Sequence, residues 1–335
     1  MDKLDFELLT QKIASLIEYQ KSINPDIAAL SPKHAPLFAQ IISNYDLKKL
    51  VSDEKPKAEM IYLGAPTGAG KDTLVRKIMQ ENPDKDYVVL NMDMFRHYHD
   101  EIIDEDQSIS DKDFAKKTNQ TSYAIYYMIQ EIILNEFPGT NVIVTGTMKD
   151  LEWVKEIVSR YKSAEKTNYS ISLATLAVPI NESAFSIFER YLHMVDTRDS
   201  SGSPLRYTDL AYHNDTTKEF ISNVQFFEDD LHKNGLESYF DSIKVYKRHL
   251  NMFDLSEKTL IYDSTNPDPS RCATAHIRDI MYSTQAITPS RITGLLNLVK
   301  DNSDYLKSQG LYKDVLYGIE QTLPMFNRSN KDVEK

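Results

Sequence analysis

The chain has 335 residues, of which 41% are hydrophobic, and its formal net charge is −11. A chain of this length buries a full core, as one large domain with appendages or as two smaller domains. The acidic balance and the lack of clustered positive charge argue against nucleic acid or an anionic membrane as a partner. Because neither a signal peptide nor an apolar run of about 18 residues is visible, we expect a cytoplasmic protein.

The apolar pattern divides the chain into three parts. Residues 1–56 have helical periodicity and end in a polar linker, Ser52 to Lys57. Residues 57–286 alternate helical stretches with strands expected at 58–63, 87–91, 141–145, 169–178, 242–246 and 259–262. This alternation predicts an α/β fold with a mostly parallel sheet between helices. Residues 287–335 return to helical periodicity and carry no readable function.

The segment from Ala58 to Leu74 has the pattern of a phosphate-binding loop: an apolar strand, a glycine-rich turn and a helical stripe. Backbone N–H groups of such a turn, with the positive end of the following helix, form an anion site that a triphosphate fills. A tight strand-to-helix turn with an exposed lysine is the alternative, which the flanking pattern disfavours. We expect a nucleoside triphosphate with Mg²⁺ at this loop, bound by Gly68, Ala69, Gly70, Lys71, Asp72 and Thr73.

The loop departs from the strict pattern at two positions. Ala65 stands where a glycine is expected, and Asp72 stands where the pattern has Ser or Thr. Thr73 follows one residue later. The order Gly-Lys-Asp-Thr is similar to the Gly-Lys-Gly-Thr of nucleoside monophosphate kinases, so we predict that Thr73 contacts phosphate or the metal.

Polar residues follow the second and third expected strands, where open parallel sheets bind their ligands. Asp93 follows the second strand, and Thr145, Thr147 and Lys149 follow the third. An aspartate opposite a phosphate loop accepts the proton of an attacking hydroxyl, while Lys71 and magnesium draw charge from the transferring phosphoryl group. We predict Asp93 as this base; a helix N-cap is the alternative that spacing alone leaves open.

Other reactive residue types carry weaker signals. His97 and His99 lack partners at zinc-site spacing, so surface or substrate contacts are expected. The acidic run from Asp100 to Asp113 predicts a solvated loop. The single cysteine, Cys272, predicts a buried or idle thiol.

Taken in order, these residues resemble the zeta toxin family, the kinases of bacterial toxin–antitoxin systems. The resemblance runs from about Ala58 to about Ser264, and its specificity lies in the ordered set. Its elements are the phosphate loop, Asp93 with Phe95, Arg96 and His99, Gly146-Thr147, Ala177-Val-Pro179, Glu189-Arg190-Tyr191, Arg206 with His213, and Ile261-Tyr-Asp-Ser264.

The resemblance implies a P-loop NTPase fold of the nucleoside-monophosphate-kinase type and transfer of the γ-phosphoryl group of ATP to a sugar hydroxyl of UDP-N-acetylglucosamine. It implies Asp93 as catalytic base, Lys71 as phosphate-loop lysine, and Arg190 and Arg206 as a clamp on the triphosphate. A guanidinium suits this role because it grips phosphate oxygens in pairs. A surface salt bridge is the alternative for each arginine. The expected substrate contacts are Arg96, His99, Thr145, Thr147 and Lys149.

The chain departs from the family pattern in the acceptor pocket. Thr145 stands where the family has a glutamate, and only Glu131 lies near the position of a second glutamate. Asp100 replaces a proline. A pocket that leaves a buried substrate donor unpaired loses about 1–3 kcal/mol. Two alternatives stay open: a kinase of another ribose-bearing acceptor such as NAD, and a nucleotide-binding module without transfer activity.

The helical segment 1–56 adds a hypothesis about regulation. In zeta systems a separate helical antitoxin blocks the nucleotide site. The resemblance suggests the hypothesis that such an antitoxin, or residues 1–56 acting in cis, blocks the nucleotide site here. Simple packing of this segment into the domain is the alternative, which an initial helix in family members favours.

Overall fold

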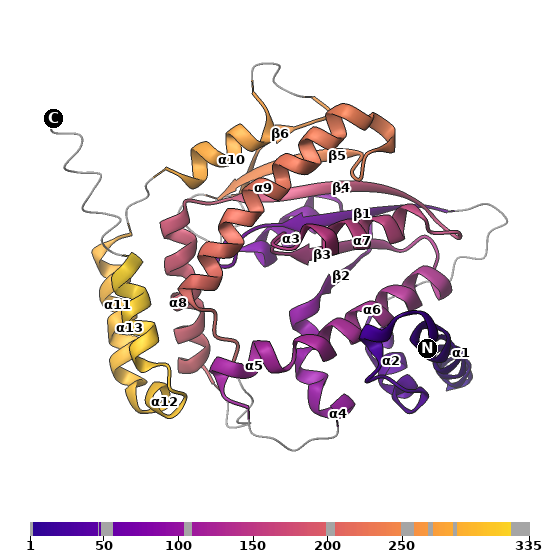
Figure 1. The fold of residues 1–335 in the computed structure, drawn as a ribbon, viewed down its shortest axis with the longest axis horizontal. Helices are drawn as coiled ribbons and strands as arrows, with labels where there is room; N and C mark the ends of the chain where they lie inside the picture. Colours follow the sequence, from indigo (N-terminus) through magenta and orange to yellow (C-terminus); the bar gives the residue numbers. More distant parts are fainter. Residues whose placement is uncertain are drawn as a thin grey trace.

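The structure is a computed structural model that describes residues 3–45, 47, 56–103, 109–198, 205–248, 258–266, 271–283 and 287–322. Within these residues a six-stranded sheet has the order β2-β3-β1-β4-β5-β6 (Figure 1). Its strands are β1 (Lys57–Gly64), β2 (Tyr87–Asn91), β3 (Asn141–Gly146), β4 (Asn168–Ala177), β5 (Ser242–Arg248) and β6 (Lys258–Asp263). Each expected strand is confirmed, with its ends shifted by no more than two residues.

The sheet is parallel except at one edge. β1 pairs in parallel with β3 and β4, and the outer strands β2 and β5 continue this direction, whereas β6 is antiparallel to β5. The predicted mostly parallel sheet is therefore confirmed. Because the strands β1 to β5 all point the same way, their carboxyl ends lie along one edge, which is where open sheets bind ligands.

Helices cover both faces of the sheet, and the alternation of side chains along each strand explains why. On β1, Met60 and Tyr62 belong to a large apolar core with α6, α7 and α9, whereas Ile61 and Leu63 belong to a second core with α3. The helices that flank the sheet are α3 (Lys71–Glu81), α6 (Asn119–Glu136), α7 (Leu151–Lys162), α9 (Leu210–Asn234) and α10 (Ala273–Met281).

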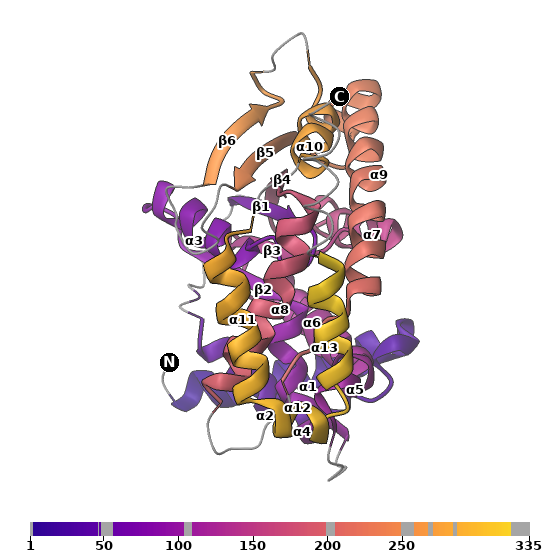
Figure 2. The same ribbon diagram turned by 90° about the vertical axis from the view of Figure 1, so that its left-hand side faces the viewer.

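A third apolar cluster joins α8 (Ile180–Asp196) to the C-terminal helices α11 (Pro289–Asp301), α12 (Ser303–Ser308) and α13 (Tyr312–Thr322). Figure 2 shows α11 and α13 side by side over α8. The packing is tight: a Cβ added to Gly318 of α13 would lie 2.1 Å from the ring of Phe188. The helical periodicity expected after residue 287 is confirmed, and these helices form a layer against α8 rather than against the sheet.

The N-terminal helices α1 (Lys3–Ile23) and α2 (Ala35–Ser43) pack against α6 (Figure 1). Leu9, Ile13 and Ile17 of α1 are buried in the same core as the strands β1 to β5. Most of the linker expected at Ser52 to Lys57 lies outside the described residues, and Lys57 begins β1. Among the described helices, none combines the length and the apolar character that crossing a bilayer requires.

One local expectation is wrong. The acidic run is no simple solvated loop, because Asp100 lies in α4 (His99–Ile103) and Asp111 begins α5 (Asp111–Lys117). Asp111 is only 1% exposed, since its carboxylate accepts hydrogen bonds from parts of the chain far away in sequence. Residues 104–108 of the run lie outside the described part. Cys272 is exposed, which rules out the buried thiol of the two alternatives expected for it and leaves the idle one.

Candidate active site

The glycine-rich turn forms a cradle between β1 and α3. Gly68 and Gly70 have φ values of 76° and 89°, a left-handed conformation that favours glycine. A Cβ on Gly68 would also lie 2.1 Å from the carbonyl oxygen of Ser183 on α8. The turn therefore needs glycine both for its backbone angles and for its close approach to α8, and it leads directly into α3 at Lys71.

Lys71 lies at the base of this cradle. Its Nζ donates to the carbonyl oxygens of Ala65 at 3.0 Å and Pro66 at 3.2 Å. Desolvation lowers the pKa of Lys71 to about 7; Asp72 opposes this shift, and the charges of Arg190 and Arg206 add to it. Three cationic side chains thus converge on one site without enough negative charge to balance them, a property of a site for a polyanion.

The carboxylate of Asp93 is held by two arginines. Arg96 Nε donates to Asp93 Oδ1 at 2.9 Å, and Arg206 Nη1 is paired with Asp93 Oδ2. Arg96 is buried and also donates to the carbonyl oxygen of Ala115 at 2.6 Å, so it is a fixed anchor. The N-cap of this segment is Asn91, whose side chain accepts from the Asp93 N–H at 3.0 Å. The carboxylate of Asp93 is therefore not used as a cap.

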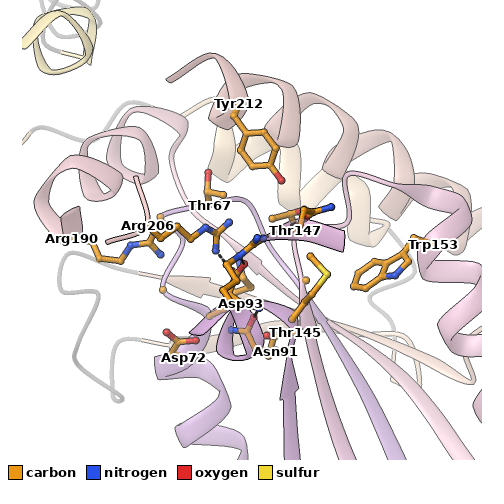
Figure 3. Close-up of a pocket in the computed structure, with 17 residues that line it drawn as sticks. Thr67, Asp72, Asn91, Asp93, Thr145, Thr147, Trp153, Arg190, Arg206 and Tyr212 are labelled. Atoms are coloured by element: carbon orange, nitrogen blue, oxygen red, sulfur yellow. Dashed lines mark hydrogen bonds and ion pairs between the residues drawn. The ribbon is translucent and has the colours of Figure 1, made fainter. Parts of the chain in front are cut away.

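These groups line one cavity of about 180 Å³ at the carboxyl ends of β1, β2 and β3 (Figure 3). Small-molecule pockets commonly have roughly 300–1,000 Å³, so this space suits a phosphate chain rather than a whole nucleotide. Among the described residues, buried polar atoms of its lining have no hydrogen-bond partner. They are Thr67 Oγ1, Thr145 Oγ1, Arg190 Nε and Arg206 Nε. Buried polar groups are normally paired, so this set fits an anionic ligand with several acceptor oxygens.

Most of the residues predicted for the site meet in this cavity. Its lining includes Gly68, Gly70, Lys71, Asp72, Asp93, Arg96, Thr145, Thr147, Arg190 and Arg206. Arg190 reaches it from α8, and Figure 3 shows Arg190 and Arg206 entering from the side opposite Trp153. Ala69 is buried within the turn, and its carbonyl oxygen accepts from Arg248 at 3.2 Å.

Two of the predicted residues, Thr73 and His99, lie outside the lining of this cavity. Thr73 is buried outside the lining, and its hydroxyl accepts from Arg76 at 3.4 Å. Successive residues of a helix point about 100° apart, and it is Asp72 that lines the cavity. His99 is bonded to Thr121, with 2.9 Å between Nδ1 and Oγ1.

Lys149 lines a second, larger cavity of about 940 Å³. The two cavities adjoin, since they share lining residues, among them Thr147, Trp153 and Tyr212. The lining of the larger cavity includes the ammonium of Lys149, three aromatic rings and four carboxylates. The rings belong to Tyr123, Trp153 and Tyr212, and the carboxylates belong to Asp26, Asp150, Glu152 and Glu219. Its lining is therefore acidic and aromatic.

Glu131 does not reach either cavity. Its carboxylate accepts from Gln20 at 2.7 Å and from Arg160 at 3.2 Å, on the side of α6 that faces α1 and α7. Glu131, the only glutamate near the position of the family's second glutamate, therefore lies outside both cavities. In its place α6 contributes Asn119 and Tyr123 to the cavities.

Sequence reasoning missed other residues of the site. Asn91, Trp153 and Tyr212 line the first cavity, and Arg248 binds the glycine-rich turn from behind. The sequence could have indicated Asn91, because this residue ends a predicted strand and lies two positions before Asp93. For Trp153 and Tyr212, on α7 and α9, the one-dimensional pattern gave no indication that they face the same opening.

Comparisons with known proteins concern the family and the fold of the chain. A family model described as zeta toxin matches residues 43–266. One similar solved structure comes from the characterization of the PezAT chromosomal toxin–antitoxin system of Streptococcus pneumoniae. It has 18% identity over 80% of this chain and 95% of that chain, with a TM-score of 0.56. That similarity shows a shared fold.

Two further similar structures are of AvrRxo1-ORF1 with AvrRxo1-ORF2. The one with sulphate ions has 10% identity over 79% of this chain and 80% of that chain, with a TM-score of 0.47. The one with ATP has 11% identity over 80% of each chain, with the same TM-score of 0.47. No curated protein matches the chain.

Proposed function

Because the chain belongs to the zeta toxin family, we propose that it is a kinase that transfers the γ-phosphoryl group of ATP to a hydroxyl of a small molecule. One observation carries the proposal: Lys71, Arg190 and Arg206 converge on a cavity that also holds the carboxylate of Asp93. Phosphoryl transfer depends on positioning and on neutralising charge. A site with three cations and one candidate base has the parts that this reaction uses.

The phosphates of ATP would lie in the cradle of Gly68 to Lys71. The unpaired Nε atoms of Arg190 and Arg206 support a polyanion there. Asp72 supplies carboxylate oxygens beside this cradle, the ligand type that magnesium prefers. We propose Asp72, in place of Thr73, as the residue of α3 that would hold Mg²⁺, which would draw charge from the phosphate oxygens.

Asp93 would become available as the base when Arg206 moves from its carboxylate to the triphosphate. In the structure Arg206 occupies Oδ2 of Asp93 while Arg96 holds Oδ1. A triphosphate offers Arg206 a stronger, bidentate partner, and its departure frees Oδ2. The acceptor O–H then gives its proton to Asp93 as its oxygen bonds to the γ-phosphorus. The bond from that phosphorus to the bridging oxygen breaks, and ADP leaves.

The acceptor would occupy the 940 Å³ cavity beside the phosphate site. The family resemblance makes a sugar nucleotide such as UDP-N-acetylglucosamine the first candidate. A second candidate is NAD or another ribose-bearing molecule, and the lining favours it. Four carboxylates and three aromatic rings suit the cationic nicotinamide ring of NAD better than the neutral head of UDP-N-acetylglucosamine.

A helical antitoxin is the proposed protein partner, by analogy with the toxin–antitoxin system of the similar structure. For the N-terminal segment we propose a structural role instead of inhibition in cis. None of its described residues lines the phosphate cavity, while α1 is part of the main core. Asp26 lines the acceptor cavity, so this segment would contribute to substrate binding.

Mass spectrometry of reactions with ATP, magnesium and an acceptor panel tests the function. The panel includes UDP-N-acetylglucosamine and NAD, and the proteins are wild type, Asp93→Asn and the control Asp100→Asn. Loss of a general base costs about 10²–10⁴-fold in rate. The proposal expects one acceptor to gain one phosphate with wild type and Asp100→Asn, and this gain to be lost with Asp93→Asn.

Two results would contradict it. A product that persists with Asp93→Asn would remove Asp93 as the base. Confirmed ATP binding without any product across the panel would favour a nucleotide-binding module.

A further inference from the structure

We propose that the C-terminal helices α11–α13 hold the two arginines of the phosphate site in position, and that Arg291 and Tyr305 are positioning residues for phosphoryl transfer. These helices lie beyond residues 43–266, the part that the family model matches. The inference rests on the proposed kinase function and adds residues to its machinery. Figures 1 and 2 show the helices against α8, on the flank away from the N-terminal segment.

Arg291 of α11 binds two carboxylates of α8 at once. Its Nη1 and Nη2 lie 3.0 Å from the two carboxylate oxygens of Glu182, and its Nε lies 2.9 Å from Glu189 Oε1. Residues seven apart lie on the same face of a helix, two turns from each other. Planar guanidinium–carboxylate pairs fix orientation as well as distance. One arginine therefore clamps two turns of α8.

The clamp continues to the phosphate loop. Glu182 is 1% exposed, and it also accepts from Arg248 Nη2 at 3.0 Å. Arg248 Nη1 in turn donates to the carbonyl oxygens of Gly68 at 2.9 Å and Ala69 at 3.2 Å. A continuous chain of ionic hydrogen bonds thus runs from α11 through α8 to the turn that would hold the phosphates. In a buried environment such contacts are strong and directional.

A second anchor lies at the other end of the C-terminal helices. The buried carboxylate of Asp111 accepts from the hydroxyl of Tyr305 on α12 at 2.7 Å and from the hydroxyl of Tyr191 on α8 at 2.8 Å. It also accepts from the backbone N–H of Leu205 at 2.7 Å. The Asp111 N–H donates to Gln309 at 3.0 Å, just past α12.

Three of the anchored positions are sequence neighbours of the two site arginines. Glu189 and Tyr191 flank Arg190 on α8, and Leu205 directly precedes Arg206. Each contact therefore fixes the backbone from which a site guanidinium extends. Because a displacement of about 1 Å at such a site costs about 100-fold in rate, loosening either anchor is expected to affect catalysis.

Hydrogen exchange of the full chain tests the brace without depending on activity. The variants are Arg291→Gln and Tyr305→Phe, and Lys307→Ala on the exposed side of α12 is the control. We expect amide exchange in residues 180–196 and 205–208 to quicken about tenfold or more in both variants. The control and the exchange of β1 to β4 should stay as in wild type. Unchanged exchange in α8 and residues 205–208 would overturn the inference.

Kinetics then separate positioning from simple stability. With folded variants at saturating substrate we expect kcat to fall by about 100-fold, with KM for ATP within a factor of two of wild type. Faster exchange with an unchanged kcat would also overturn the positioning role. If Arg291→Gln does not fold, Tyr305→Phe carries the test, because it removes a single hydroxyl. An inactive wild type would refute the proposed function, while the exchange result would still decide on the brace.

Discussion

The lowered pKa of Lys71 predicts that the proposed binding of ATP weakens as the pH rises. Desolvation lowers the pKa of Lys71 to about 7 in the free protein. A bound triphosphate favours the charged ammonium and raises this pKa, so binding above pH 7 takes up a proton. Affinity should therefore fall as the pH rises above about 7. The terminal phosphate titrates near pH 6, so it contributes little to the change between pH 7 and pH 9.

The size of the effect follows from the same value. If only the charged lysine binds, the apparent Kd rises by a factor of about 1 + 10^(pH − 7), roughly 11 at pH 8 and roughly 100 at pH 9. Each pH unit then corresponds to about 1.4 kcal/mol of binding free energy. The matched variant is Lys71→Arg, whose guanidinium stays charged throughout. Its affinity should be flat from pH 7 to pH 9, whatever its absolute value.

Titration calorimetry in HEPES and in Tris measures both the Kd for ATP and the number of protons taken up on binding. These buffers differ in ionisation enthalpy, so the difference in heat gives the number of protons bound. For wild type at pH 8 we expect an uptake of about 0.9 proton for each ATP bound, and for Lys71→Arg an uptake near zero. Equal uptake in both proteins, or a wild-type Kd that does not change between pH 7 and pH 9, would refute the reasoning.

Three further predictions use substitutions elsewhere. Gly318→Ala places a methyl group against Phe188 and should lower the free energy of unfolding by about 1–3 kcal/mol. Gly294→Ala on α11 has open space around its Cβ and should raise the free energy of unfolding by about 1 kcal/mol. Thermal unfolding measures both changes, and equal shifts would contradict the packing argument. Gly68→Ala should abolish ATP binding in calorimetry, because its Cβ meets a carbonyl of α8; retained affinity would show that the turn adapts. Trp153→Ala should raise KM for the acceptor about tenfold or more and leave KM for ATP unchanged; equal effects on both would place Trp153 in the nucleotide site.

The positions of the strands and the phosphate loop were predictable because each depends on local pattern. Strands buried on both faces are continuous apolar runs, and a glycine-rich turn between a strand and a helix has few other uses. The direction of β6 was not predictable, since the apolar pattern of an edge strand is the same in either direction. The position of Thr73 outside the cavity lining has a similar origin. Whether Asp72 or Thr73 faces the ligand depends on the residue at which α3 begins, and spacing alone leaves that open.

The remaining misses concern contacts between distant parts of the chain. Asp111 was expected in solvent because its neighbours in sequence are acidic. Its burial depends on Tyr191 and Tyr305, which are 80 and 194 residues away. The second cavity likewise needs Trp153 and Tyr212 from separate helices, together with Asp26 from the N-terminal segment. Such sites arise only when the elements pack, so they require the three-dimensional structure.

Because an apolar cluster joins α8 to the C-terminal helices, the folding unit extends beyond residue 266, where the match to the family model ends. A fragment that ended at residue 266 would uncover the apolar flank of α8, including Phe185 and Phe188. Contiguous apolar surface of this kind promotes aggregation. Shortening the chain to its recognisable part would therefore yield an insoluble or misassembled product. Loss of activity in such a fragment would say nothing about the chemistry of the site.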